Sequence, residues 1–144
     1  ATVIHGGRQP EGTGGLYYEP TIVECPRQDL RIVDTELFGP VASVLRFRDE
    51  DEGVRLANAS SYGLAAGVFT RDSARSVRMA QAIRSGIVWV NTYRAISPIA
   101  EFGGMKDSGH GRESGLQAVY DYTRPKTVWM NTSSEPLGSQ FVSR

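Results

Sequence analysis

The sequence has very little of several features that would identify a class of protein directly. Its 144 residues include one cysteine, Cys25, and two histidines, His5 and His110. One cysteine excludes a disulfide framework within the chain and is typical of a reducing compartment such as the cytoplasm. The cysteine and the two histidines lie far apart and match no zinc-site spacing, so we expect no metal site.

Excess charge and long apolar runs are also missing. Lysine plus arginine number 16, as do aspartate plus glutamate, so the formal net charge is +0. A neutral chain has no electrostatic footprint for nucleic acid or for an anionic membrane. No apolar run approaches the ~20 residues that cross a bilayer, and the first ten residues do not resemble a secretory signal. We therefore expect neither nucleic acid nor a membrane as a partner.

The composition that is present is typical of a globular domain. Hydrophobic residues make up 40% of the chain and charged residues 22%. The length is that of one ordinary domain, so we expect a single domain over 1–144 with a core of its own. Glycine is frequent, with 16 residues, which predicts tight turns or close approaches of the backbone.

The pattern of apolar residues predicts an α/β fold in which helices flank a mostly parallel sheet. Residues 1–15 read as loops and turns, and Pro20 lies within the first expected strand, which marks that strand as broken or at an edge. Alternation of strands and helices implies parallel neighbours. The continuous apolar run at 87–91 predicts a strand buried on both faces. The five expected strands are 17–23, 41–47, 64–69, 87–91 and 127–131.

Three helices are expected, two of them with clear starting signals. Asp49 and Glu52 have the spacing of a capping box, Asp72 is a good N-cap, and Gly86 is a helix-stop signal. The long stretch 92–112, rich in glycine and proline, is typical of a functional loop. The expected helices are 50–58, 73–85 and 113–120.

Residue types alone indicate no complete catalytic centre. Cys25 precedes a proline and has no nearby base or helix N-terminus to lower the pKa of its thiol, which favours a structural role. Ser108 and His110 lie two residues apart, but triads are not assembled from sequence neighbours. The glycines at 109–115 follow the pattern Gly-x-Gly-x-x-x-Gly, which is not that of a dinucleotide-binding loop.

Several longer motifs together are more specific. The sequence reads Glu-Leu-Phe-Gly-Pro-Val at 36–41, and Tyr-Gly-Leu-Ala-Ala followed by Val-Phe-Thr-Arg-Asp over 62–72. It then reads Gly-Ile-Val-Trp-Val-Asn at 86–91 and Phe-Gly-Gly-Met-Lys-Asp-Ser-Gly, followed closely by Gly-Arg-Glu, over 102–113. In this order and at these separations the motifs resemble those of the aldehyde dehydrogenases, over nearly the whole chain.

The resemblance implies part of an oxidoreductase that converts an aldehyde to a carboxylic acid with NAD or NADP, through a cysteine thiohemiacetal. In that family the nucleophilic cysteine, the general-base glutamate, the oxyanion-hole asparagine and the NAD domain all lie upstream of these motifs. We therefore expect the C-terminal part of a catalytic domain, inactive alone. The alternatives are a non-enzymatic oligomerisation or binding module, and a small thiol enzyme using Cys25, which slow labelling by iodoacetamide would exclude.

The same resemblance assigns three binding residues. Glu36 matches the glutamate that accepts hydrogen bonds from the nicotinamide ribose, a role that suits an acceptor-only carboxylate. Phe38 matches the aromatic residue that packs beside the nicotinamide ring. Phe102 matches an aromatic residue that lines the aldehyde tunnel, and Glu101 stands before it where the family often has proline.

Two further expectations concern assembly and structure. Lys106, Arg112 and Glu113 resemble members of a structural ion-pair network. The segment 122–134, with its expected strand at 127–131, resembles the strand with which these enzymes pair with a partner subunit, so we expect a homo-oligomer.

Overall fold

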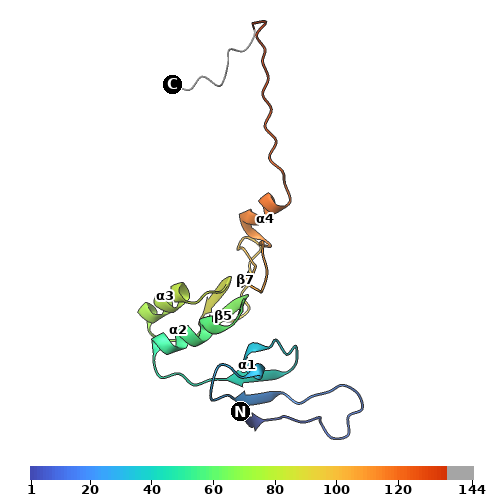
Figure 1. Cartoon of the computed structure of the whole chain (residues 1–144), viewed down its shortest axis with the longest axis vertical. Helices are drawn as coiled ribbons and strands as arrows, with labels where there is room; N and C mark the ends of the chain where they lie inside the picture. Colours follow the sequence, from blue (N-terminus) through green and yellow to red (C-terminus); the bar gives the residue numbers. More distant parts are fainter. Residues whose placement is uncertain (136–144) are drawn as a thin grey trace.

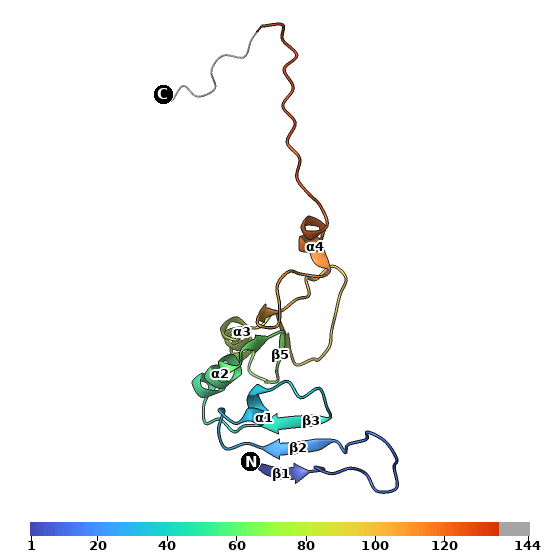
Figure 2. The ribbon, with the colours of Figure 1, turned by 45° about the vertical axis from the view of Figure 1, so that its right-hand side comes forward.

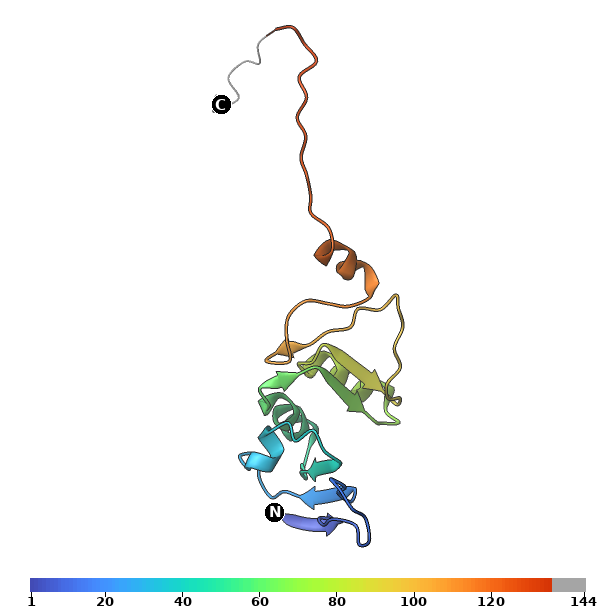
Figure 3. The same ribbon diagram turned by 90° about the vertical axis from the view of Figure 1, so that its right-hand side faces the viewer.

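Three small β-sheets and four helices follow one another along an elongated molecule in the computed structural model, which describes residues 1–135 (Figure 1). A three-stranded sheet lies at one end of the molecule. Two two-stranded sheets and the two longer helices form its middle, and an extended segment leads away at the other end (Figure 3). The α/β class is therefore confirmed, but the single, mostly parallel sheet is not.

The first sheet consists of β1 (Thr2–His5), β2 (Thr21–Glu24) and β3 (Val41–Val44), in that order. β1 pairs antiparallel to β2, so the prediction of loops alone for residues 1–15 is wrong. β2 begins only after Pro20, because proline has no N–H to donate to a strand ladder. β2 and β3 are parallel, and a short helix, α1 (Arg31–Asp34), lies between them in the sequence.

The two longer helices begin where their capping residues predict. α2 (Glu50–Ala59) is capped by Asp49, whose Oδ1 accepts a hydrogen bond from the backbone N–H of Glu52 at 2.8 Å. In α3 (Ser73–Ala82), Asp72 caps the helix in the same way. A side-chain acceptor at this position satisfies one of the four free N–H groups at a helix start.

The predicted end of α3 is wrong. The helix ends at Ala82, four residues before Gly86, and the residue after Ala82 is already extended. The backbone N–H of Gly86 donates to the carbonyl of Gly63 at 2.9 Å. Gly86 therefore belongs to the sheets that follow, and contacts distant in sequence decide where the helix stops.

The central strands form two separate pairs. β5 (Ala65–Val68) and β6 (Ile87–Val90) are parallel, and α3 packs against both. β4 (Tyr62–Gly63) instead pairs antiparallel with β7 (Met105–Lys106). It lies just before the strand expected at 64–69, which the structure forms as β5. With two of the four strand pairs antiparallel, the expected predominance of parallel pairing is not observed. β6 is half-buried throughout, not buried on both faces.

The C-terminal part leaves the rest of the molecule. α4 (Gly115–Asp121) occupies most of the helix expected at 113–120. The segment that follows, up to residue 135, projects away from the other elements (Figure 2). The strand expected at 127–131 is not formed, since these residues have no ladder partner in the described chain.

The core is much smaller than the length and composition predict. Among the described residues, the buried apolar side chains are those of Val23, Cys25 and Val68. The accessible surface is 11959 Å², whereas a compact monomer of 15.7 kDa exposes about 7,300 Å². Many large apolar side chains are exposed among these residues, and contiguous exposed apolar surface is typical of interfaces with other protein. No helix in residues 1–135 combines the length and apolarity that a membrane span requires.

Candidate functional site

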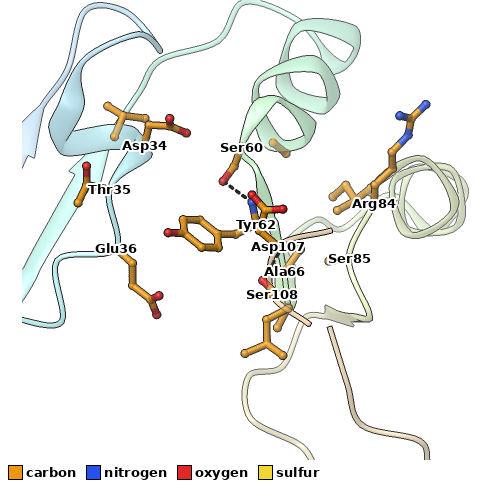
Figure 4. A pocket seen from close by; sticks show the side chains of 16 residues that line it. Asp34, Thr35, Glu36, Ser60, Tyr62, Ala66, Arg84, Ser85, Asp107 and Ser108 are labelled. Carbon is orange, nitrogen blue, oxygen red and sulfur yellow. Dashed lines mark hydrogen bonds between the residues drawn. The ribbon is translucent and has the colours of Figure 1, made fainter. Parts of the chain in front are cut away.

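A cavity of about 530 Å³ brings Glu36 close to residues far from it in the sequence (Figure 4). Residues 33–36, at and after the end of α1, form one side. The opposite side comes from the end of α2, from β4 and the start of β5, and from the turn after β7. Figure 4 shows Glu36 extending towards the side that carries Tyr62 and Ser108.

The opposite wall is held by the motif that contains Lys106. The ammonium Nζ of Lys106 donates to the carbonyls of Asn58 and Ser60, at 3.1 and 2.9 Å. These carbonyls lie at the C-terminus of α2, where a cation is favourable because of the helix dipole. Next to it, the hydroxyl of Ser108 accepts a hydrogen bond from the N–H of Gly63 at 2.9 Å. The loop 102–113 is thereby fixed to β4 and to the end of α2.

The predicted ion-pair network of Lys106, Arg112 and Glu113 is wrong. None of the three forms an ion pair within residues 1–135. Arg112 instead donates through Nη1 to the carbonyls of Gly104 and Gly111, at 2.8 and 2.7 Å. The glycine-rich loop leaves these backbone acceptors without ladder partners, and the guanidinium of Arg112 supplies the donor that they would otherwise take from a neighbouring strand.

Glu36 is an exposed carboxylate at the cavity, and no ion pair engages it within residues 1–135. An ionised carboxylate has two oxygens that only accept hydrogen bonds. Two neighbouring hydroxyl groups, as on a ribose, are donors of the matching kind. The chemistry of Glu36 therefore fits the sugar of a nicotinamide cofactor.

Phe38 lies just beyond Glu36 but does not line the same cavity. Its side chain is 94% exposed, and its backbone has a φ of 48°. A left-handed conformation is uncommon for a bulky residue and costs on the order of 1–3 kcal/mol. This backbone conformation leaves the aromatic ring of Phe38 exposed to solvent. The ring is therefore available to pack against a ligand or against another part of a longer protein.

Phe102 lies on the other side of the start of β5. Its backbone N–H and carbonyl both pair with those of Glu113, at 2.7 Å each. Its side chain lines a cavity of about 400 Å³, which shares Leu64, Ala65 and Ala66 with the cavity of Glu36. The segment 64–66 therefore forms a common wall between two residues that are distant in sequence.

Sequence reasoning missed most of the residues around these two expected positions. They are Tyr62, which faces Glu36, and three residues of the Phe102 cavity, Trp89, Tyr93 and Arg94. The last two follow the carboxyl end of β6, which pairs in parallel with β5. Ligands of α/β proteins often bind beyond the carboxyl ends of parallel strands, and this rule is the signal that could have identified them.

Cys25 takes no part in either cavity. Its side chain is 2% exposed, and its nearest polar partner is the carbonyl of Val23, at 3.8 Å from Sγ. A thiol buried in this way has little access to substrates or reagents. Its position supports the structural role predicted from the sequence.

Comparison with known proteins gives consistent results. A family model described as "Aldehyde dehydrogenase family" matches residues 1–128. A (Z)-2-((N-methylformamido)methylene)-5-hydroxybutyrolactone dehydrogenase from Acinetobacter baylyi is 52% identical over 145 aligned residues, which cover 100% of this chain and 30% of that protein. The cytosolic aldehyde dehydrogenase 1 of Rattus norvegicus is 45% identical, over 90% of this chain and 26% of that protein.

Solved structures show the same similarity. PnpE from Pseudomonas sp. WBC-3, in a crystal structure with nicotinamide adenine dinucleotide, superimposes with a TM-score of 0.88 at 40% identity. The match covers 97% of this chain and 29% of PnpE. The chain therefore spans less than a third of the length of the relatives that it matches.

Proposed function

The chain belongs to the aldehyde dehydrogenase family, and we propose that it is the C-terminal part of the catalytic domain of an NAD- or NADP-dependent enzyme. The order of its motifs, from 36–41 to 102–113, supports this position in the longer protein. The many exposed large apolar side chains also support it, because only three apolar side chains are buried among residues 1–135 and exposed apolar surface of this kind is typically covered by further protein.

The proposed reaction oxidises an aldehyde to a carboxylic acid. The aldehyde, water and the oxidised cofactor become the acid, the reduced cofactor and a proton. The nicotinamide, when bound, accepts the hydride that leaves the aldehyde carbon. The nucleophilic cysteine that forms the thiohemiacetal belongs to the part of the enzyme outside this chain, so this chain alone is expected to be inactive.

Within this reaction, Glu36 and Phe38 position the nicotinamide end of the cofactor. The exposed carboxylate of Glu36 at the larger cavity carries the proposal, because it offers acceptors to both ribose hydroxyls. The exposed ring of Phe38, two residues on, limits where the nicotinamide ring lies. Phe102, across the shared wall of 64–66, lines the passage of the aldehyde.

The segment 122–134 provides an edge for assembly. Val128, Trp129 and Met130 are 68%, 87% and 79% exposed in this chain. An extended apolar segment without a ladder partner is a template for strand pairing. We expect it to pair with a sheet of a second subunit, giving a symmetric homo-oligomer.

The first test is the size and activity of the protein in its source cells. An antibody against this chain is expected to detect a polypeptide several times larger than 15.7 kDa. The purified full-length protein is then expected to reduce NAD or NADP in the presence of aldehydes. A native polypeptide of 15.7 kDa, or a full-length protein that reduces neither cofactor with any of a panel of aldehydes, contradicts the proposal.

The second test addresses Glu36 directly in the full-length enzyme. Glu36→Gln removes a charge-assisted acceptor worth about 1.5–3 kcal/mol, so kcat/KM for the cofactor is expected to fall by about 10- to 100-fold. Asp34→Asn is the matched control, since Asp34 lines the same cavity but is not expected to hold the ribose. Equal kinetics of wild type and Glu36→Gln would remove Glu36 from the cofactor site.

A further inference from the structure

The loop after β6 forms an aromatic cavity around Phe102 that contains a single charge. Trp89, Tyr93 and Ile96 line this cavity of about 400 Å³ together with Phe102. Arg94 is the one charged residue among the described residues of its lining. An apolar pocket with one charged group favours an apolar ligand that carries one group of the opposite charge.

The position of Arg94 is determined by the folding of the loop back onto β6. The indole N–H of Trp89 donates to the carbonyl of Ala95 at 2.8 Å, and the rings of Trp89 and Tyr93 meet edge to face, 5.5 Å apart. The guanidinium of Arg94 lies 5.6 Å from the centre of the Tyr93 ring. Asn91 and Arg94 both have left-handed backbones, with φ of 53° and 58°, a conformation that persists only where the surroundings enforce it.

The charge of Arg94 is not neutralised within residues 1–135. No carboxylate in this part of the chain lies within ion-pair distance of it, whereas Arg75 and Arg78 both pair with Glu50. A guanidinium stays protonated at all physiological pH values and presents several N–H donors in a plane that matches a carboxylate. Contact of one face with an aromatic ring leaves the donors at its edge available.

We propose that Arg94 selects aldehydes that carry a carboxylate at the far end of an aromatic or apolar body. This inference depends on the proposed function, because it takes the Phe102 cavity as part of the aldehyde passage. The body of the substrate packs among Trp89, Tyr93 and Phe102, while the carboxylate binds the guanidinium of Arg94. The aldehyde group alone is oxidised, and the carboxylate leaves unchanged as one end of a dicarboxylic acid.

The test compares two substrates that differ in this charge and in one methyl group. In the full-length enzyme, kcat/KM is measured for 4-carboxybenzaldehyde and for methyl 4-formylbenzoate, its neutral ester. Wild type is expected to prefer the carboxylate by about tenfold or more, since hydrogen bonds between two charged groups are stronger than those to a neutral ester. Arg94→Gln is expected to abolish this preference by lowering kcat/KM for the carboxylate alone, and Arg94→Lys to retain part of it.

The neutral ester and a second arginine provide the controls. Activity on the ester shows that each variant is folded, and Arg71→Gln removes a positive charge outside the cavity lining and is expected to keep the preference. If wild type oxidises both substrates equally, or if Arg94→Gln keeps the preference, this inference is overturned while the proposed function stands. Oxidation of neither substrate, nor of any other aldehyde, overturns both.

Discussion

The middle of the chain, residues 50–91, and its C-terminal part, residues 92–135, are stabilised in different ways. In the middle, each long helix is capped by the aspartate that precedes it. The two helices are joined by Glu50, which accepts hydrogen bonds from Arg75 at 3.0 Å and from Arg78 at 2.9 Å. In the C-terminal part, the apolar side chains of Leu116 and Trp129 are 70% and 87% exposed.

The polar contacts of the C-terminal part also differ from those of the middle. The ammonium group of Lys106 reaches back to the carbonyls of Asn58 and Ser60. These contacts join residues more than 40 positions apart. The middle is therefore stabilised largely by contacts within itself, whereas the C-terminal part has few such contacts, and we expect its conformation to depend on further protein.

The largest expected effect comes from separating the chain from the rest of the enzyme. Residues 1–144 expressed alone are expected to show no cooperative unfolding transition, because the three apolar residues buried among 1–135 cannot offset the conformational entropy of folding. Hydrogen exchange is expected to show 92–135 unprotected in the isolated chain and protected in the full-length enzyme. A sharp transition, with both regions equally protected in the isolated chain, would contradict this view.

A smaller effect is expected where the two regions touch. A methyl group on Gly86, at the start of β6, would collide with the carbonyl oxygen of Gly103. Backbone atoms cannot move aside cheaply, so Gly86→Ala is expected to destabilise the full-length protein by about 1–3 kcal/mol or more. Urea unfolding measures this, with Gly14→Ala as the control because nothing lies within 4 Å of a methyl group there. Equal costs for the two substitutions would show that Gly86 and Gly103 do not approach closely in the full-length protein.

The smallest effect concerns the ion pairs between α2 and α3. Hydrogen bonds from Arg78, and then from Arg75, lower the pKa of Glu50 from 4.5 to about 2. Because the pKa is lower in the folded state, the stabilisation is present above pH 4.5 and is lost as the pH falls towards 2. The difference in urea midpoint between wild type and Glu50→Gln is therefore expected to shrink below pH 4.5. It should also shrink in high salt, since these side chains are exposed.

The control for this last prediction is Glu113→Gln, because Glu113 has no ion pair within the described residues. This substitution is expected to leave the midpoint nearly unchanged at pH 7. A difference for Glu50→Gln that stayed constant as the pH fell through the window between the two pKa values, from 4.5 to about 2, and in high salt would show that the charge of Glu50 adds nothing to stability.

Prediction from the sequence succeeded where the decisive contacts are local. Asp49 and Asp72 cap their helices as predicted, because each cap joins residues three positions apart. The motifs around Glu36 and Phe102 indicated the family that the family model confirms. The roles of Glu36, Phe38 and Phe102 themselves remain predictions for the kinetic tests.

Prediction from the sequence failed where segments far apart in the chain decide which backbone N–H and C=O groups are paired. β1 was missed because its partner strand starts 16 residues after it ends. The divided central sheet follows from the pairing of β4 with β7, more than 40 residues further along the chain. Lys106 and Arg112 were expected to form ion pairs with acidic side chains, but within the described residues they donate to backbone carbonyls instead. The expected strand at 127–131 has no partner within residues 1–135, and strand pairing is a property of two edges, not of one sequence.

The sequence by itself determined the family, the starts of the two long helices and the motif at 36–41 that contains Glu36. These follow from motifs and caps whose partners are only a few positions away. Only the tertiary structure decided that 64–66 forms a wall between Glu36 and Phe102, and that Arg94 joins an aromatic cavity. Such placements depend on long-range contacts that pair the backbone N–H and C=O groups and bury apolar surface at the same time. Many such contacts are possible for one chain, and no local sequence pattern determines which of them forms.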